Sequence, residues 1–308
     1  MTTLLRWGRS AYETDAALAE ERRLLAALGV PVLHFQGADP PLDGVTVMAV
    51  TSKVQVTEAL LSRAPDLKLV VTTTSGHEHI DVQAAQARGV AVARCPLARR
   101  DAVVDTAVGM ALSFLRDLPG LQARARAGVW ARGELPARAP RRARDVTVGV
   151  VGLGVIGRRA AEVWAALGAQ VLACDPAVPG TLPLAELLPR ADVLTLHCAL
   201  TASSSALIHR GNLHRLKPGV ILINTARGGC LDLPALLHAP RIGGLGLDVF
   251  PQEPWPELAA LAARDDVLIT PHAAGYHPGL GEAVAAELAD TVACFLAGRP
   301  LPHPVTAA

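Results

Sequence analysis

The chain has 308 residues, 51% of them apolar, and carries 29 Lys and Arg against 28 Asp and Glu, a formal net charge of +1. This length exceeds one comfortable hydrophobic core, so we expect two packed domains that fold without disulfide or metal. The near-neutral charge gives no overall attraction to nucleic acid or to an anionic membrane, and no run approaches the roughly 20 apolar residues of a membrane span. A small-molecule partner is therefore expected.

Five scattered cysteines form no C-x-x-C pair, and their number is odd, which argues against a disulfide framework and against a zinc site. We interpret them as reduced thiols. Together with an N-terminal segment that lacks the apolar core of a signal peptide, they predict a cytoplasmic protein. The cysteines are Cys95, Cys174, Cys198, Cys230 and Cys294.

The first part of the chain alternates strand-like apolar segments with helical ones, which is the rhythm of βαβ units. The predicted strands are 3–7, 30–35, 45–50 and 67–72, and the predicted helices are 12–28 and 57–63. After the fourth strand comes Thr74-Ser75-Gly76-His77, a turn of small residues whose backbone amides can face a ligand.

Residues 101–116 are apolar almost all round, which favours a buried helix. The arm 121–144 that follows is rich in Arg, Ala and Pro, contains Trp130 and has no clear period, so we expect an extended excursion packed on another surface. Its arginines are interrupted by Pro and Gly and have no aromatic ladder, which argues against nucleic-acid binding.

A second βαβ series then supplies six further strands, and one last helix, 280–296, is expected to return to the first domain. The prediction is an α/β protein with two Rossmann-like or flavodoxin-like domains and parallel sheets, the second of them doubly wound. The expected limits are 1–98 plus 276–308 for a discontinuous substrate domain and 99–275 for a cofactor domain. The strands of the second series are 146–151, 170–174, 193–197, 220–224, 244–249 and 267–270.

The motif G-x-G-x-x-G, formed by Gly152, Gly154 and Gly157, stands directly after an apolar strand and at the start of a helix. The first glycine permits a tight turn, the second lets the backbone approach a pyrophosphate, and the third lets helix and strand pack closely. Val155 and Ile156 are expected to supply backbone amides to the pyrophosphate. The alternative is a glycine-rich turn in a flavodoxin-like sheet that binds no dinucleotide.

The next strand ends in Asp175, which lies 18 residues beyond Gly157, where a carboxylate can accept the hydroxyls of an adenosine ribose. A carboxylate repels a 2′-phosphate, and no arginine follows it to bind one. The predicted cofactor is therefore NAD, with NADH preferred over NADPH.

Three further segments each place a polar residue just past an apolar strand. They read N-x-x-R-G-G up to Gly229, L-D-V-F-x-x-E-P up to Pro254 and T-P-H-x-x-G up to Gly275. Singly, such residues are usually turn or surface residues. In this order behind a dinucleotide turn, the motifs resemble those of the D-isomer-specific 2-hydroxyacid dehydrogenases over nearly the whole chain.

The resemblance implies catalytic roles for Arg227, His272 and Glu253. Arg227 would hold the substrate's carboxylate and carbonyl, and His272 would protonate the carbonyl oxygen as hydride arrives at C2 of a 2-oxoacid. Glu253 would pair with the histidine and orient it. The chemistry agrees, because a guanidinium is a fixed fork of donors and an imidazole changes protonation near neutral pH.

The resemblance also implies further cofactor contacts. Asp248 would contact the nicotinamide carboxamide, Thr225 and Ala226 would lie beside the nicotinamide ribose, and Gly275 closes the third motif.

In the first domain, Ser75 and Gly76 match the family's loop whose amides cradle the substrate carboxylate. Lys53 is either a residue that faces the substrate or a solvated surface lysine. His77 and His79 lie near the expected pocket and are candidate specificity residues.

The chain departs from the family pattern at several positions. Asp105 replaces the usual Glu of a V-A-E sequence, and Cys198-Ala199 stands where members have a residue followed by Pro. The bulky His77-Glu78-His79 leaves the substrate's size open.

The resemblance implies a 2-oxoacid reductase, with no metal site, that forms a homodimer through the cofactor domain and its arm. Formate-type or phosphite-type dehydrogenases on the same fold are alternatives. A non-catalytic NAD(H)-binding corepressor-like protein is another.

Overall fold

The computed structural model describes residues 2–238 and 242–307. It divides into two compact units, one formed by Met1–Arg99 with Tyr276–Ala308 and the other by Arg100–Gly275. These limits lie within one residue of the domain limits expected from the sequence. Each unit contains one sheet of parallel strands, so the predicted α/β class with two parallel sheets is confirmed.

The first unit contains a five-stranded sheet in the order β2-β1-β3-β4-β5. Residues 82–94 form a short helix and a short strand that the sequence analysis did not identify, because this segment is rich in alanine and gives little contrast between apolar and polar positions. The strands are β1 (Leu4–Trp7), β2 (Val32–Phe35), β3 (Val47–Val50), β4 (Leu69–Thr72) and β5 (Ala91–Arg94), and the short helices are α2 (Glu58–Ser62) and α3 (Val82–Ala87).

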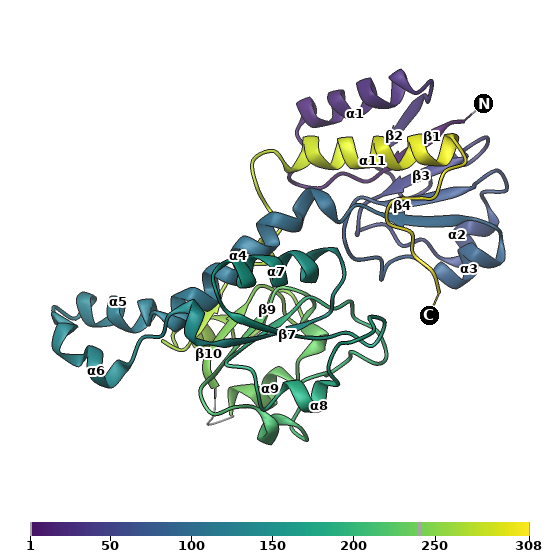
Figure 1. The fold of residues 1–308 in the computed structure, drawn as a ribbon. Coiled ribbons are helices and arrows are strands. Elements are labelled where there is room, and N and C mark those ends of the chain that lie inside the picture. The colour runs from purple at the N-terminus through teal and green to yellow at the C-terminus, as the bar shows by residue number, and fades with distance from the viewer. Residues whose placement is uncertain (1, 239–241, 308) are drawn as a thin grey trace. The chain divides into compact units, whose positions relative to one another are not determined.

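Two long helices, α1 (Asp15–Ala27) and α11 (Leu280–Leu296), lie side by side in this unit (Figure 1). Leu25 of α1 and Leu288 of α11 are both fully buried in the cluster that also contains residues of β1, β3 and β4. The C-terminal helix therefore completes the core of the first unit, as the sequence suggested.

The second unit contains a six-stranded parallel sheet in the order β11-β10-β9-β8-β6-β7. The chain runs from β6 outward to β7 on one side and continues with β8 on the other side, so the strand order reverses between β6 and β8. In open parallel sheets, ligands bind at the carboxyl ends of strands beside such a point. The strands are β6 (Thr147–Val151), β7 (Gln170–Cys174), β8 (Val193–Leu196), β9 (Val220–Asn224), β10 (Ile242–Leu247) and β11 (Val267–Ile269).

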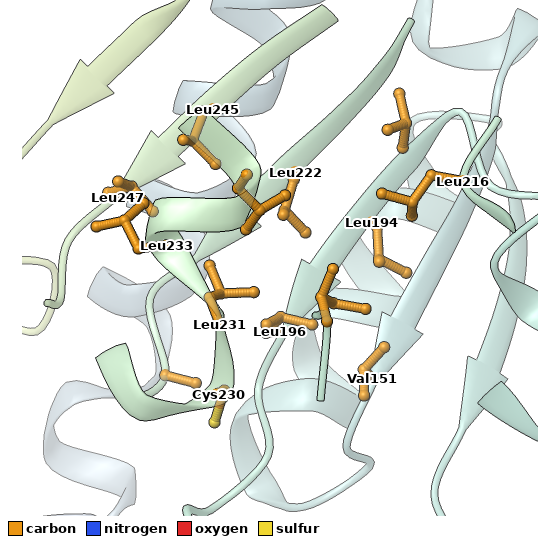
Figure 2. Close-up of a cluster of buried hydrophobic side chains, with 14 of the residues drawn as sticks. Val151, Leu194, Leu196, Leu216, Leu222, Cys230, Leu231, Leu233, Leu245 and Leu247 are labelled. Atoms are coloured by element: carbon orange, nitrogen blue, oxygen red, sulfur yellow. The ribbon is translucent and has the colours of Figure 1, made fainter. Parts of the chain in front are cut away.

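Apolar clusters cover both faces of this sheet. Along β9, Leu222 belongs to one cluster, while Ile221 and Ile223 belong to the other, as the two-residue repeat of a strand requires. Figure 2 shows the first cluster, which includes leucines of β8, β9 and β10 together with Cys230. The second cluster contains α4 (Leu97–Leu115) and α7 (Val155–Ala166).

The arm after α4 is an excursion from the six-stranded sheet, as predicted, and it is helical, which the sequence analysis did not predict. It forms α5 (Leu118–Arg126) and α6 (Leu135–Arg138), which extend away from the six-stranded sheet (Figure 1). None of the residues in these helices is buried. The fold of the arm depends on ion pairs, because Glu134 accepts hydrogen bonds from both Arg124 and Arg138. Ion pairs of this kind leave no apolar period in the sequence.

No helix within residues 2–238 and 242–307 is long and apolar enough to cross a membrane.

Candidate active site

The glycine turn after β6 is so closely packed that side chains do not fit. Gly152 has φ of +89°, and a Cβ atom there would lie 2.7 Å from the backbone N and Cα of Cys198. A Cβ atom on Gly157 would lie 1.8 Å from the carbonyl oxygen of Gly152. Both contacts involve backbone, which cannot move aside, so the turn requires glycine at both positions.

Helix α7 begins at this turn with its first amides available to a ligand. Gly154 is the N-cap residue, and it has no side chain to accept a hydrogen bond from the first turn of the helix. The amides of Val155 and Ile156 therefore have no acceptor within the helix, and they carry the positive end of its dipole. This arrangement fits the pyrophosphate of a dinucleotide.

Asp175 follows β7 and lies against the same turn. Its Oδ2 atom accepts a hydrogen bond of 2.7 Å from the amide of Leu153, and its Oδ1 atom accepts one of 2.9 Å from the amide of Ala177. The carboxylate is thus fixed beside the turn with lone pairs left on both oxygens. This position fits the predicted contact with ribose hydroxyls.

A neutral histidine supports the turn from the next strand. His197 follows β8, and burial lowers the pKa of its imidazole to about 4. Its Nε2 atom lies 3.0 Å from the hydroxyl of Thr195. The sequence analysis assigned His197 no role of its own. Its position at the strand end beside the glycine turn was the available signal.

Arg227 follows β9 and is held by the residues on either side. Its backbone is extended, with φ of −145° and ψ of 137°. Asn224 donates a hydrogen bond of 2.9 Å to the carbonyl of Arg227 and accepts one of 3.0 Å from the amide of Ala226. The guanidinium is half-buried and donates to the carbonyl of Ala226 at 2.7 Å. Asn224, which the sequence analysis quoted only as part of a motif, therefore fixes the arginine's backbone.

His272 and Glu253 form a direct pair, as predicted. The Nδ1 atom of His272 lies 2.8 Å from Oε2 of Glu253, and the amide of Phe250 donates to the other carboxylate oxygen at 3.0 Å. Because an ionised carboxylate can only accept, Nδ1 carries the proton in this pair. The Nε2 atom of the ring is then the one that can serve a substrate. The two side chains are 54% and 38% exposed, so the site is open to solvent.

Asp248 fixes the loop that carries His272. Its side chain is buried, and one oxygen, Oδ1, accepts hydrogen bonds from the Thr270 hydroxyl at 2.6 Å and from the amides of Ala273 and Ala274 at 2.7 and 3.0 Å. Its carbonyl also accepts a hydrogen bond of 2.8 Å from the amide of His272. His272 has φ of +53°, a left-handed conformation that a non-glycine residue adopts only when its surroundings enforce it.

This role of Asp248 was not predicted. The structure assigns its Oδ1 atom to the loop, and the predicted contact with the nicotinamide carboxamide stays a prediction. Thr225 and Ala226 are both buried, and the hydroxyl of Thr225 has no hydrogen-bond partner among the described residues. Gly275, half-buried, is the last residue of the second unit.

The predicted substrate loop of the first unit lies at the carboxyl end of β4. Its turn is shaped by hydrogen bonds from the Thr74 hydroxyl to the carbonyl of Gly76 at 2.8 Å and from Arg94 to the carbonyl of Ser75 at 3.1 Å. The Ser75 hydroxyl is buried without a partner. The Ser75 hydroxyl therefore has an unused hydrogen-bonding capacity, and the predicted contact of Gly76 with substrate stays a prediction.

The other candidates of the first unit are arranged differently. Lys53 is exposed in the turn after β3. His79 is buried and His77 is half-buried, so both belong to the packing of the loop.

Within the second unit, the structure brings together the residues of all three motifs. Strands β9, β10 and β11 are hydrogen-bonded neighbours, and Arg227, Asp248 and His272 each follow one of them. Among the described residues, no group of three or more His, Cys, Asp or Glu side chains is placed to hold a metal ion. The cluster can therefore orient a carboxylate and exchange one proton, with a dinucleotide turn in the same sheet.

Comparison with known proteins agrees with this site. Residues 108–274 match the family model described as the NAD binding domain of the D-isomer specific 2-hydroxyacid dehydrogenases. The chain belongs to this family. The predicted family and the predicted cofactor, NAD, are thereby confirmed.

Relatives in the family act on several small acids. The chain is 33% identical over 307 residues to a D-3-phosphoglycerate dehydrogenase of Mycobacterium leprae, covering 96% of this chain and 57% of that protein. The chain thus spans little more than half the length of that relative. It is 33% identical to a glycerate dehydrogenase of Methylorubrum extorquens, covering 87% of this chain and 86% of the relative.

A solved structure has the same architecture. The D-lactate dehydrogenase of Aquifex aeolicus, complexed with NAD and lactic acid, superposes with a TM-score of 0.79 at 28% identity and covers 96% of each chain. The family fold is therefore shared over almost the full length of the two chains.

Proposed function

We propose that this protein is an NAD-dependent dehydrogenase that transfers hydride between NADH and the C2 carbonyl of a 2-oxoacid. The observation that carries the proposal is the pairing of His272 with Glu253 at 2.8 Å, in a sheet that also presents Arg227. The family's relatives, which include phosphoglycerate and glycerate dehydrogenases, support it.

The chain's residues have separate roles in this reaction. NADH, when bound, supplies the hydride. Arg227 holds the carboxylate of the substrate through its fork of donors and keeps its charge at any working pH. Nε2 of protonated His272 donates the proton that converts the substrate's carbonyl oxygen into a hydroxyl, and Glu253 stabilises the charged ring through Nδ1.

We assign cofactor preference and substrate contacts from the same reasoning. Asp175 favours NADH over NADPH, because its carboxylate repels a 2′-phosphate. The first unit acts as the substrate domain, where Ser75 and Gly76 hold the carboxylate and Lys53 is a further substrate contact. Asp248, Thr225, Ala226 and Gly275 contribute to the nicotinamide site.

The test is NADH oxidation by the purified protein across 2-oxoacids graded in size and charge, with NADPH as control. Turnover of any member with NADH supports the proposal. In the same assay, His272→Ala should lower kcat by about 10²–10⁴-fold, the usual contribution of a general acid, and leave NADH binding intact. Unchanged kcat in this variant would refute the role of His272.

We also propose a homodimer formed through the second unit. Trp130 on the arm is 90% exposed, a large apolar surface for a single chain. A groove of about 460 Å³ lies in the same unit, between α4, α5 and β11, and Leu118, Pro119, Val267 and Leu268 are among its lining residues. Trp130 of a second copy is our candidate for this groove, since two such contacts would satisfy a two-fold axis.

Light scattering after size exclusion tests this arrangement. Wild type should run as a dimer and Trp130→Ala as a monomer or a weakened dimer. A monomeric wild type would refute it. We propose a cytoplasmic location, because the five scattered cysteines of the sequence show no pattern of a disulfide framework.

A further inference from the structure

Two cysteines that the proposed reaction does not use lie in contact beside the cofactor turn. The sulfur atoms of Cys198 and Cys230 are 3.9 Å apart. Cys198 lies two residues beyond the end of β8, and Cys230 ends the short helical turn Gly228–Cys230 that follows Arg227. Both residues belong to the second unit.

The backbone of Cys198 packs directly against the glycine turn that is expected to bind the pyrophosphate. Its backbone N and Cα lie 2.7 Å from the place where a Cβ atom on Gly152 would stand, so turn and cysteine are packed backbone to backbone. A displacement of Cys198 therefore removes the support of the turn at its tightest position.

Cys230 is tied to the catalytic arginine. Its amide donates a hydrogen bond of 3.1 Å to the carbonyl of Arg227, the same carbonyl that accepts from Asn224. Its own carbonyl accepts a bond of 3.3 Å from the amide of Ile208, and its side chain is fully buried in the cluster of Figure 2. The dithiol therefore joins the back of the cofactor turn to the segment that carries Arg227.

We propose that Cys198 and Cys230 form a reversible disulfide when the protein meets a peroxide, and that this disulfide weakens NADH binding. Peroxide is the oxidant. The thiolate of Cys198, the more accessible of the two, attacks one peroxide oxygen, the O–O bond breaks, and water leaves, giving a sulfenic acid. The sulfur of Cys230 then attacks the Cys198 sulfur, the S–O bond breaks, and a second water leaves. Two thiols lose two electrons and two protons in all, and one peroxide becomes two waters.

The shortening of the distance between the two sulfur atoms is the reason why we expect NADH affinity to fall. A disulfide bond is about 2.05 Å long, so the sulfur atoms must approach each other by almost half of their present separation. Cys230 is held by backbone hydrogen bonds at both its amide and its carbonyl, whereas Ala199, which follows Cys198, is exposed and its carbonyl is bound by the Ser204 side chain. The Cys198 segment therefore makes most of the movement, and this movement withdraws its backbone from Gly152.

The reaction should be slow at neutral pH. The hydrogen bond with Cys230, and then burial, raise the pKa of the Cys198 thiol. Since the thiolate is the reactive form, the oxidation rate should rise about tenfold for each pH unit over the neutral range. Such a site responds to sustained oxidant rather than to brief exposure.

The experiment treats the full-length protein with hydrogen peroxide, maps its peptides by mass spectrometry and measures NADH affinity from nicotinamide fluorescence. The expected product is one intramolecular Cys198–Cys230 linkage, with a mass lower by two hydrogens. The dissociation constant for NADH should rise at least about fivefold, as the loss of one support of the pyrophosphate turn implies, and dithiothreitol should restore it.

Cysteine variants test whether Cys198 and Cys230 are the two residues that form the disulfide. Cys198→Ser and Cys230→Ala, each compared with itself before and after peroxide, should show no linkage and no change in NADH affinity. The matched control Cys294→Ser changes a half-buried cysteine of α11 and should respond like wild type. Oxidation of Cys198 without linkage, linkage to another cysteine, or a linked protein with unchanged NADH affinity would each overturn the proposal. None of these readouts needs a 2-oxoacid, so the proposal stands or falls independently of the proposed substrate.

Discussion

Replacing Asp248 by Ala tests whether one buried carboxylate fixes the loop that carries His272. The change removes the acceptor of three hydrogen bonds, from the Thr270 hydroxyl and from the amides of Ala273 and Ala274. Each donor left unsatisfied in a buried place costs about 1–3 kcal/mol. Ala273 is exposed and can bond to water instead, so two donors remain and the expected loss is about 2–6 kcal/mol.

This loss should appear in both stability and turnover. For a unit of this size, each kcal/mol lowers Tm by about 2–4 °C, so Asp248→Ala should melt about 4–24 °C below wild type. The left-handed conformation of His272 is no longer enforced, and the pairing of its ring with Glu253 is lost. We expect kcat to fall about 100-fold, within the range for a misplaced general acid.

The matched control is Asp248→Asn, whose amide oxygen can still accept all three hydrogen bonds. It should lie within about 1–1.5 kcal/mol of wild type, the value of a typical net hydrogen bond. Thermal melting, NADH affinity and 2-oxoacid reduction are measured on both variants. If Asp248→Ala melts with wild type, or if the Asn variant is as unstable as the Ala variant, the acceptor role assigned to Oδ1 is wrong.

Three further predictions concern the second unit. Gly157→Ala should lower both Tm and NADH affinity, because its Cβ would lie 1.8 Å from a backbone oxygen. Gly154→Ala should weaken NADH binding and leave Tm unchanged, because its Cβ meets nothing within 4 Å. Titration calorimetry and thermal melting compare the two variants. Burial alone raises the pKa of Asp192, but hydrogen bonds from Lys217 and a backbone amide hold this pKa below the usual 3.8. The ionised carboxylate therefore stabilises the folded state above pH 3.8, and this stabilisation is lost as the pH falls through the lower pKa of the folded state. Asp192→Asn should therefore cost about 1–3 kcal/mol at pH 7 in urea unfolding and flatten the acid limb, and an unchanged acid limb would contradict this. Asp175→Ala should reduce the preference for NADH over NADPH about tenfold or more in kcat/KM, and an unchanged ratio would exclude Asp175 as its source.

The regular core of the fold was predictable because strong periods mark its elements. Strand β7 and helix α11 have the bounds 170–174 and 280–296 that the sequence predicted. The short α3 and β5 were missed, since their alanine-rich sequence gives little contrast between apolar and polar positions. The helices of the arm were missed for a different reason. Its helices are stabilised by pairs such as Arg124 with Glu134, and such pairs depend on three-dimensional placement rather than on a sequence period.

The candidate site was predictable in its membership but not in its internal connections. The order of the motifs and their resemblance to the dehydrogenase family indicated Arg227 and His272, and both lie at the carboxyl ends of parallel strands, where ligands bind. The role of Asp248 in fixing the His272 loop was not visible, because a hydrogen bond to the amides of Ala273 and Ala274 requires the loop to fold back onto β10. The contact of Cys198 with Cys230 was not visible either, since the two residues are 32 positions apart and belong to the segments that follow two different strands.

The internal connections explain how residues from separate strands can hold one geometry. The carbonyl of Asn224 accepts a hydrogen bond of 3.0 Å from the amide of Asp248, and the carbonyl of Asp248 accepts one of 2.8 Å from the amide of His272. Asn224 also donates its side-chain amide to the carbonyl of Arg227. The backbones of the arginine and the histidine are thus joined through Asn224 and Asp248, at the ends of adjacent strands. A carboxylate clamp and a proton donor arranged in this way take their separation from the spacing of the sheet, so the open, solvent-exposed His272 ring does not need burial to be placed correctly.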